Sequence, residues 1–294
     1  MVNKSHKVLI ALQGPINEKT YKCAETFLDL NYDLVMIGWQ GVNLANFEQS
    51  KIKIDLIKDP KTLVAKDGLK DINTRRQILT NKYLLDNYQT DYDYIIRLRN
   101  DIKLVNKKFF LKQFSIAQKK NKLWSINVNT SAPRILSPFL LSHHISDWFF
   151  AGTPKQLRKN LQLNDINESE IVKNKPCEFK NFYFSRKVQN EQAIWKRPWR
   201  QLKSQNKFQL LYKKPWIKNN FKICKEYAIF LNKNFFISPF RKTGIESIKY
   251  KFNLKNWYFN PYNLFILNSF EIFLLNRGLI VLNILYPPIL RIFF

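Results

Sequence analysis

Apolar and polar positions alternate in a way that predicts strands and helices in turn from the N-terminus to about residue 150. Lys7–Leu12 and Leu34–Gly38 are compact apolar runs, which are typical of strands buried on both faces of a sheet. Thr20–Leu30 instead carries apolar side chains at helical spacing. This order predicts an α/β fold with a mainly parallel sheet and helices on both faces. The remaining predicted strands are Ile52–Ile57, Tyr92–Asp101, Lys122–Val128 and Ile145–Phe150, and the remaining predicted helices are Asn73–Tyr88, Phe109–Lys119 and one beginning near Val188.

Three segments between these elements are predicted to be loops or turns. Ser131–Pro138 carries two prolines, and Asn160–Lys180 is polar without a regular period. The sequence Gly152-Thr153-Pro154 is typical of a tight turn after a short strand.

The strand predicted at Tyr92–Asp101 ends in an unusual set of charges. Strand alternation places Arg97, Arg99 and Asp101 on the face of Ile95, opposite the apolar face. Such charges are costly to bury unless they are paired or bind a ligand, and open α/β sheets bind ligands beyond the carboxyl ends of their strands. Two interpretations stay open: a phosphate ligand on the arginines with a divalent metal on the aspartate, or a buried Arg–Asp ion pair. The apolar face carries Tyr94, Ile96 and Leu98.

Two other boundaries carry residues that suit an anionic ligand. Gln13 and Gly14 follow the first strand, where a glycine allows close approach of the backbone to a ligand, or simply forms a turn. Asn73 opens a helix that continues with Arg75 and Arg76. This start is either an ordinary N-cap or an anion site made by a helix N-terminus and arginines.

Two carboxylates are candidates for acid–base chemistry. Asp147 stands beside Trp148, and a carboxylate in an apolar pocket has a raised pKa that suits a general base. Its alternative roles are an N-cap or a buried hydrogen-bond acceptor. Glu191 is either a base or a first-turn helix residue. A metal site of His144 with Asp147 is a third and less specific pattern.

Absent motifs narrow the functional classes. The chain has no nucleophile elbow, Walker loop, GxGxxG or zinc motif, which argues against serine hydrolases, P-loop enzymes and dinucleotide enzymes. Cys23, Cys177 and Cys224 are widely spaced and form no disulfide framework, which indicates a reducing compartment. The apolar run at 8–12 is too short for a signal peptide, so we expect a cytoplasmic protein.

Charge is strongly basic and unevenly distributed. The chain has 49 Lys and Arg against 22 Asp and Glu, a net charge of +27, which attracts nucleic acid, anionic lipid or phosphorylated substrates. From Lys196 to Lys255 sixteen basic residues stand against Glu226 and Glu246, with aromatic residues between them. Asn256–Phe294 is nearly uncharged but has no run of about 18 apolar residues. We expect a helix in the membrane interface, held by the basic segment on anionic headgroups, or a helix packed on the body.

Five motifs in this order resemble the WavE-type lipopolysaccharide synthesis proteins, which are glycosyltransferases similar to the GT-A nucleotide-sugar fold. The resemblance covers about Lys7 to Trp195, which suggests a catalytic domain over residues 1–195 and a basic, apolar, largely helical extension over 196–294. The motifs are QGP, NTRRQ, YIIRLRND, SDWFFAGTP and NEQ.

The resemblance implies a role for each candidate residue. Arg97, Arg99 and Asp101 would stand in the place of the metal-binding DxD motif, with Mn or Mg on Asp101. RLRND offers one carboxylate where DxD offers two, so arginines would replace much of the metal's charge on the diphosphate. The residues implied to lie near the nucleotide are Gln13, Gly14, Asn73 and Arg76, and those implied to face the acceptor are Asp147 and Glu191.

The resulting hypothesis is transfer of a sugar from a nucleotide sugar to a lipid-linked glycan acceptor, in lipopolysaccharide or surface polysaccharide biosynthesis at the inner face of the cytoplasmic membrane. The alternative is a non-enzymatic nucleic-acid-binding or membrane-surface protein that uses the basic C-terminal segment. The alternative explains the charge but leaves RLRND and SDW without a role.

Overall fold

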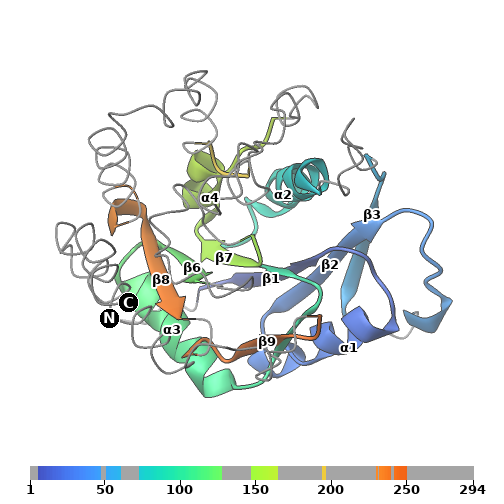
Figure 1. Ribbon diagram of the computed structural model, residues 1–294, viewed down its shortest axis with the longest axis horizontal. Coiled ribbons are helices and arrows are strands. Elements are labelled where there is room, and N and C mark those ends of the chain that lie inside the picture. The colour runs from blue at the N-terminus through green and yellow to red at the C-terminus, as the bar shows by residue number, and fades with distance from the viewer. Residues whose placement is uncertain are drawn as a thin grey trace, which may run out of the picture.

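A seven-stranded sheet in the order β3-β2-β1-β4-β7-β6-β8 runs through the centre of the molecule (Figure 1). Strand β7 is antiparallel to both of its neighbours and the other pairs are parallel, so the prediction of a mainly parallel sheet is confirmed. A second, two-stranded sheet pairs β5 with β9. The computed structural model describes residues 6–47, 51–60, 73–127, 147–164, 194–196, 230, 232–239 and 242–249. The strands are β1 (Val8–Gln13), β2 (Asp33–Trp39), β3 (Lys53–Ile57), β4 (Tyr94–Arg99), β5 (Ile102–Leu104), β6 (Leu123–Asn127), β7 (Phe149–Gly152), β8 (Phe235–Pro239) and β9 (Ile245–Ser247).

Helices cover both faces of the central sheet, as predicted. Figure 1 shows α2 and α4 over one face and α1 and α3 over the other. Each face has its own hydrophobic core, because alternate strand residues point to opposite sides. Ile95 packs in the core under α2, whereas Ile96 and Leu98 pack in the core under α3, as the alternation in this strand predicted. The helices are α1 (Glu18–Glu25), α2 (Thr74–Tyr88), α3 (Lys107–Lys119) and α4 (Pro154–Asn160).

The helix predicted over 20–30 is in fact two shorter elements. α1 begins after Asn17, whose side chain accepts a hydrogen bond from the Thr20 backbone in a capping box. It ends at Glu25, and a 3-10 turn follows at Leu28–Leu30. Leu30 is buried like the helical positions before it, so the apolar period continued past the true end of the helix.

The turn predicted at Gly152-Thr153-Pro154 is the start of a helix. The Thr153 hydroxyl accepts from the Gln156 backbone, and the Gln156 side chain accepts from the Thr153 backbone. Pro154 occupies the first helical position, where its missing N–H costs nothing. The threonine is therefore an N-cap, and the proline begins α4.

Two strands come from the segment that the sequence assigned to an extension. β8 pairs with β6 at the edge of the central sheet, and β9 pairs with β5. β8 is thus part of the central sheet and β9 part of the second sheet, while the boundary at residue 195 stays a prediction. The helix expected within 256–294 lies outside the described residues. Within the described part of the chain, no helix has the length and apolarity needed to span a membrane.

Candidate functional site

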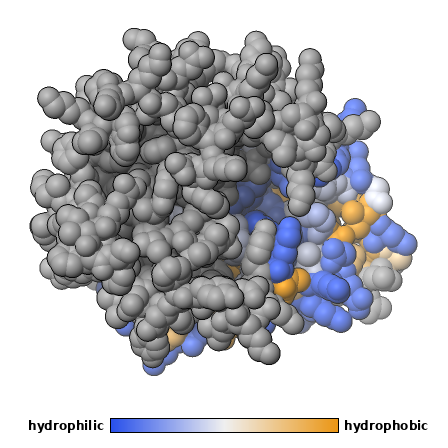
Figure 2. Space-filling model, viewed as in Figure 1, coloured by the Kyte–Doolittle hydropathy of each residue, from blue (hydrophilic) through white to orange (hydrophobic). Residues whose placement is uncertain are grey.

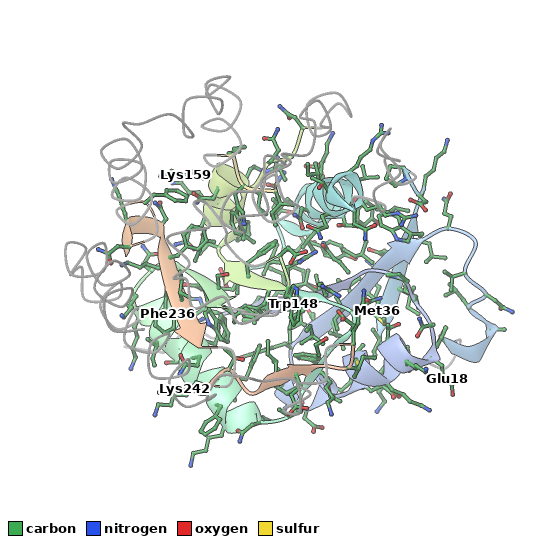
Figure 3. The ribbon with its side chains drawn as sticks, viewed as in Figure 1. Glu18, Met36, Trp148, Lys159, Phe236 and Lys242 are labelled. Atoms are coloured by element: carbon green, nitrogen blue, oxygen red, sulfur yellow. The ribbon has the colours of Figure 1, made fainter. Side chains whose placement is uncertain are left out.

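The candidate site lies where the ends of β1 and β4 meet the start of β7. In the register of these strands Arg97 stands beside Ala11 and Phe150, and Arg99 stands beside Gln13. Because β7 is antiparallel, its first residues meet the last residues of β4 at the same edge of the sheet. Figure 3 shows Trp148, just before β7, at the centre of the ribbon. The polar residues at the carboxyl ends of β1 and β4 therefore lie close together, at the edge of the sheet where α/β proteins bind ligands.

Arg97 is a buried cation whose direct partners are neutral. Only 1% of its surface is exposed. Its Nε donates to Gln13 Oε1 at 2.7 Å, and its Nη1 donates to the backbone carbonyl of Asp147. The guanidinium also lies 5.2 Å from the centre of the Phe150 ring. An arginine has five N–H donors, so this geometry leaves donor capacity on a buried positive charge.

The electrostatic surroundings of Arg97 reflect this burial. Burial lowers the pKa of Arg97 to about 10, the nearby Asp147 opposes that shift, and Arg99 adds to it. The guanidinium thus stays charged at neutral pH, in a place where charge is disfavoured. An anion beside it would offset that cost.

Asp147 is held from two sides. Gln77, in the first turns of α2, donates to its Oδ2 at 2.7 Å, while Arg97 binds its backbone carbonyl. The side chain is buried beside Trp148. Asp147 is therefore buried and accepts a hydrogen bond, as one of the sequence interpretations predicted, while its role as a base stays a prediction.

Two buried amide atoms in this cluster have no partner. Gln13 Nε2 is left free because Oε1 faces Arg97, and Gln77 Oε1 is left free because Nε2 faces Asp147. Buried polar atoms without a hydrogen bond are rare in folded proteins. They provide one donor and one acceptor to a bound molecule.

Arg99 and Asp101 form a separate cluster at the end of β4. The guanidinium donates from Nε and Nη2 to the two carboxylate oxygens, each at 2.9 Å. Ser247 of β9 also donates to Oδ2 at 3.1 Å, and Arg99 lies over the ring of Trp148 at 5.0 Å. The ion-pair interpretation of this strand end is therefore correct for Arg99 with Asp101, whereas no carboxylate of the described residues contacts the Arg97 side chain directly.

This cluster does not fit a divalent metal as it stands. Both oxygens of Asp101 already accept hydrogen bonds from Arg99. No group of three or more His, Cys, Asp or Glu side chains with metal-binding geometry occurs among the described residues. Binding of Mn or Mg at Asp101 would require Arg99 to release it, so metal binding there stays a prediction.

Gly14 permits a close contact between the ends of β1 and β4. Its φ is +141°, and a Cβ there would lie 2.5 Å from Asn100 Oδ1. The Asn100 backbone donates to the Gln13 carbonyl at 3.1 Å, and its side chain donates to the Pro15 carbonyl. The space that the missing Cβ of Gly14 leaves is therefore filled by the Asn100 side chain, which accounts for this glycine on structural grounds alone.

Arg76 belongs to a third cluster, at the ends of β2 and β3. Its side chain donates to both oxygens of Asp59 and lies 5.5 Å from the centre of the Trp39 ring. Asn73 stands at the N-cap position of α2 but makes no capping bond with its side chain. Its Oδ1 accepts instead from Arg76 at 3.4 Å. Asn73 thus occupies the N-cap position, as one of the two interpretations predicted, but without a side-chain capping bond.

The structure thus brings Gln13, Arg97 and Asp147 together and keeps Arg99 with Asp101 as a neighbouring pair. The sequence analysis missed Gln77 and Asn100 as site residues, although both stand inside the motifs NTRRQ and RLRND. An asparagine or glutamine in a sequence does not indicate whether its amide is buried, because this depends on contacts with distant parts of the chain. Glu191 and His144 lie outside the described residues.

Comparison with known proteins identifies a family for this chain. A family model described as WavE lipopolysaccharide synthesis matches residues 16–272, well past the end of the resemblance near residue 195. No curated protein matches the chain. One similar solved structure is the glycosyltransferase GlyE in Streptococcus pneumoniae TIGR4, at 10% identity and a TM-score of 0.32. The similarity covers 51% of this chain and 35% of the GlyE chain, so this chain spans about a third of that structure.

Proposed function

We propose that this chain, which belongs to the WavE lipopolysaccharide synthesis family, is a glycosyltransferase that transfers a sugar from a nucleotide-sugar donor to a lipid-linked glycan acceptor. We further propose a fold of the GT-A type. The mainly parallel sheet with one antiparallel strand beside β4, and with helices on both faces, supports this proposal.

The observation that carries the proposal is the buried charge of Arg97. Its direct partners are an amide oxygen, a backbone carbonyl and an aromatic ring. The buried Gln13 Nε2, which has no hydrogen-bond partner among the described residues, adds a further donor at the same edge. A diphosphate placed there would receive charge-assisted hydrogen bonds.

In the proposed reaction these donors stabilise the leaving group. As the bond between the anomeric carbon and the diphosphate oxygen breaks, the nucleoside diphosphate leaves with the electron pair, and Arg97 with Arg99 stabilises the added negative charge. The nucleotide would extend past Gly14 toward Arg76 and Asn73.

The acceptor side requires a base if the reaction inverts the anomeric centre. The acceptor hydroxyl would give its proton to the carboxylate of Asp147 while its oxygen bonds to the anomeric carbon. Gln77 holds this carboxylate in place by its hydrogen bond to Oδ2. Glu191 is the second proposed candidate for this role.

A donor screen tests the proposal. Thermal unfolding should be measured with UDP-, GDP-, CMP- and ADP-sugars, because a ligand at about 100 times its dissociation constant stabilises the folded state by about 2.7 kcal/mol. One nucleotide class should raise the melting temperature of the wild type clearly more than that of Arg97→Lys. Arg158→Lys is the matched control, because Arg158 binds Gln89 and Asp86 away from the strand ends. If no nucleotide sugar raises the melting temperature, or if both variants respond alike, the proposal is wrong.

A further inference from the structure

A second feature of the chain is a surface around the start of α3 that combines exposed hydrophobic side chains with lysines. Among the described residues, Val105 and Phe109 are the two large hydrophobic side chains that are exposed, each at 48%. Both lie at the N-terminal end of α3, one just before the helix and one in its first turn. Isolated exposed hydrophobic residues are common, but here the two stand together.

The charged residues that flank these two along the sequence are all basic, although Lys103 is paired with Glu246 of β9. The sequence has no Asp or Glu between Asp101 and Asp147, while residues 103–122 carry seven lysines. Lys108 and Lys112 are exposed and one turn apart, so they share one side of the helix. Among the described residues no carboxylate pairs with either of them. We name Val105, Phe109, Lys108 and Lys112 the α3 surface.

These lysines are poorly placed for the stability of the helix itself. A helix N-terminus carries partial positive charge and favours acidic side chains, yet the first turn of α3 contains no acidic residue and begins with Lys107 and Lys108. The positive potential of the helix end and that of the lysines therefore add. A surface of negative charge outside the protein would relieve both.

The backbone under this surface is firmly held. The N–H groups of Val105 and Asn106 donate to the Gly244 carbonyl at 2.8 and 3.0 Å, and Asn106 Oδ1 accepts from the Phe109 backbone at 3.0 Å. The exposed hydrophobic side chains thus stand on a capped helix start rather than on a loose loop.

We propose that the α3 surface docks on an anionic lipid bilayer, with Phe109 and Val105 entering the interface and the lysines binding headgroups. Charge complementarity is the reason for choosing this partner: lysines near an anionic membrane and aromatic or aliphatic side chains at its boundary are the two components of interfacial binding. This surface is formed by described residues and is distinct from the C-terminal segment 256–294.

Docking here would set the candidate site close to the bilayer. Val105 follows Asp101 by four residues through strand β5, which spans at most about 14 Å. β9 links the two places as well, because it pairs with β5 and its Ser247 binds Asp101. A lipid-linked acceptor would then be presented within reach of the strand ends. The docking itself is independent of the proposed transfer reaction.

Flotation of the full chain with vesicles tests the proposal. Vesicles of phosphatidylcholine alone and with phosphatidylglycerol should be compared at low and high salt. The wild type should bind the anionic vesicles at low salt and be released by salt. The double variant Lys108→Glu with Lys112→Glu should lower the partition coefficient at least about tenfold, because each lysine near such a surface contributes about one kcal/mol. Phe109→Ser, which keeps the charge, should lower it several-fold.

The matched control is Lys155→Glu with Lys159→Glu on α4, which makes the same charge change with the same spacing on the opposite face of the sheet. Lys155 and Lys159 are both exposed, and Figure 3 shows Lys159 far from α3. This control should change the partition coefficient less than twofold. Equal losses in both pairs, an unchanged coefficient in the α3 pair, or equal binding to neutral vesicles would overturn the proposal. The proposal would also be overturned if the chain bound single-stranded DNA but no vesicles, and if the variant Lys108→Glu with Lys112→Glu lost that DNA binding.

Discussion

Arg97 and Arg99 are two residues apart on one strand, yet they occupy opposite electrostatic situations. Arg97 is buried between β1 and β7, and its direct partners are neutral. Arg99 ends the strand and closes a bidentate ion pair with Asp101. The same side chain therefore has spare binding capacity in one place and is satisfied within the protein in the other.

The difference follows from the position of each residue in the sheet. Arg97 is flanked by paired strands on both sides, so its charge cannot reach a carboxylate from its own strand end. At Arg99 the chain leaves the sheet and turns into β5, which brings Asp101 back toward the guanidinium. Two arginines close together in the sequence can thus differ, one contacting neutral groups and the other paired with a carboxylate of the protein. Figure 2 shows hydrophilic residues over much of the described surface visible in that view, with hydrophobic residues among them.

The largest expected effect is on the Arg97 side. Asp147→Asn should lower kcat by about 10² to 10⁴, because a general base contributes that much. Donor affinity should be unchanged, since the backbone carbonyl still binds Arg97 and the asparagine oxygen still accepts from Gln77. The measurement is kcat at saturating acceptor, together with donor titration by calorimetry. Donor affinity that falls in step with kcat would contradict the acceptor-side role.

Arg97→Lys and Arg99→Lys compare the two arginines directly. Arg97→Lys keeps the charge but loses the fork that reaches both Gln13 and Asp147, so donor affinity should fall by about 10- to 100-fold, as expected for charge-assisted bonds of about 1.5–3 kcal/mol. Arg99→Lys should lower donor affinity less, because two N–H groups of this side chain already donate to Asp101. Dissociation constants for the donor would measure both. Equal losses would show that the two arginines act as one unit on the ligand.

The interaction between Arg99 and Asp101 should be measurable as a coupling in the free energy of unfolding rather than in donor affinity. Arg99→Ala and Asp101→Asn should each lower the free energy of unfolding by about 1–3 kcal/mol, and the double variant should lose clearly less than the sum. Urea unfolding of the four proteins gives the coupling energy. Additive losses would contradict a structural pair.

The same comparison addresses the metal. Because Arg99 occupies both oxygens of Asp101, excess chelator should leave the turnover of the wild type unchanged. Turnover that chelator abolishes and Mn or Mg restores would show that Arg99 releases Asp101 in the working enzyme.

A further prediction concerns the contact that holds the ends of β1 and β4 together. Gly14→Ala should destabilise the protein by about 1–3 kcal/mol, through its positive φ and the clash with Asn100. Gly41→Ala is the matched control: Gly41 also has a positive φ, of +92°, but no atom lies within 4 Å of its would-be Cβ. Thermal unfolding should show a greater loss at Gly14 than at Gly41. Equal losses would mean that Asn100 moves aside without cost.

Some of the candidate site was readable in advance. The motif at Arg97 was identifiable because charged residues in a strand that is otherwise apolar demand a partner. The buried setting of Asp147 followed from the aromatic residues after it. Gln77 could not be chosen among its neighbours, because a glutamine on a helix gives no sign of whether its amide faces solvent or a carboxylate in another element.

The sequence by itself determined the local elements and the face of each strand residue, since both follow from the period of apolar side chains. It predicted β4 with Ile95 and Arg97 on one face, and the mainly parallel sheet around it. Only the tertiary structure decided which charges pair. Asp101 meets Ser247, and Arg97 meets Gln13, because sheet register joins residues more than 80 positions apart along the chain, whereas the pair of Arg99 with Asp101 is local. Such contacts depend on strand order, with β7 entering antiparallel and β9 returning from the far end of the chain, and no local period of the sequence encodes that order.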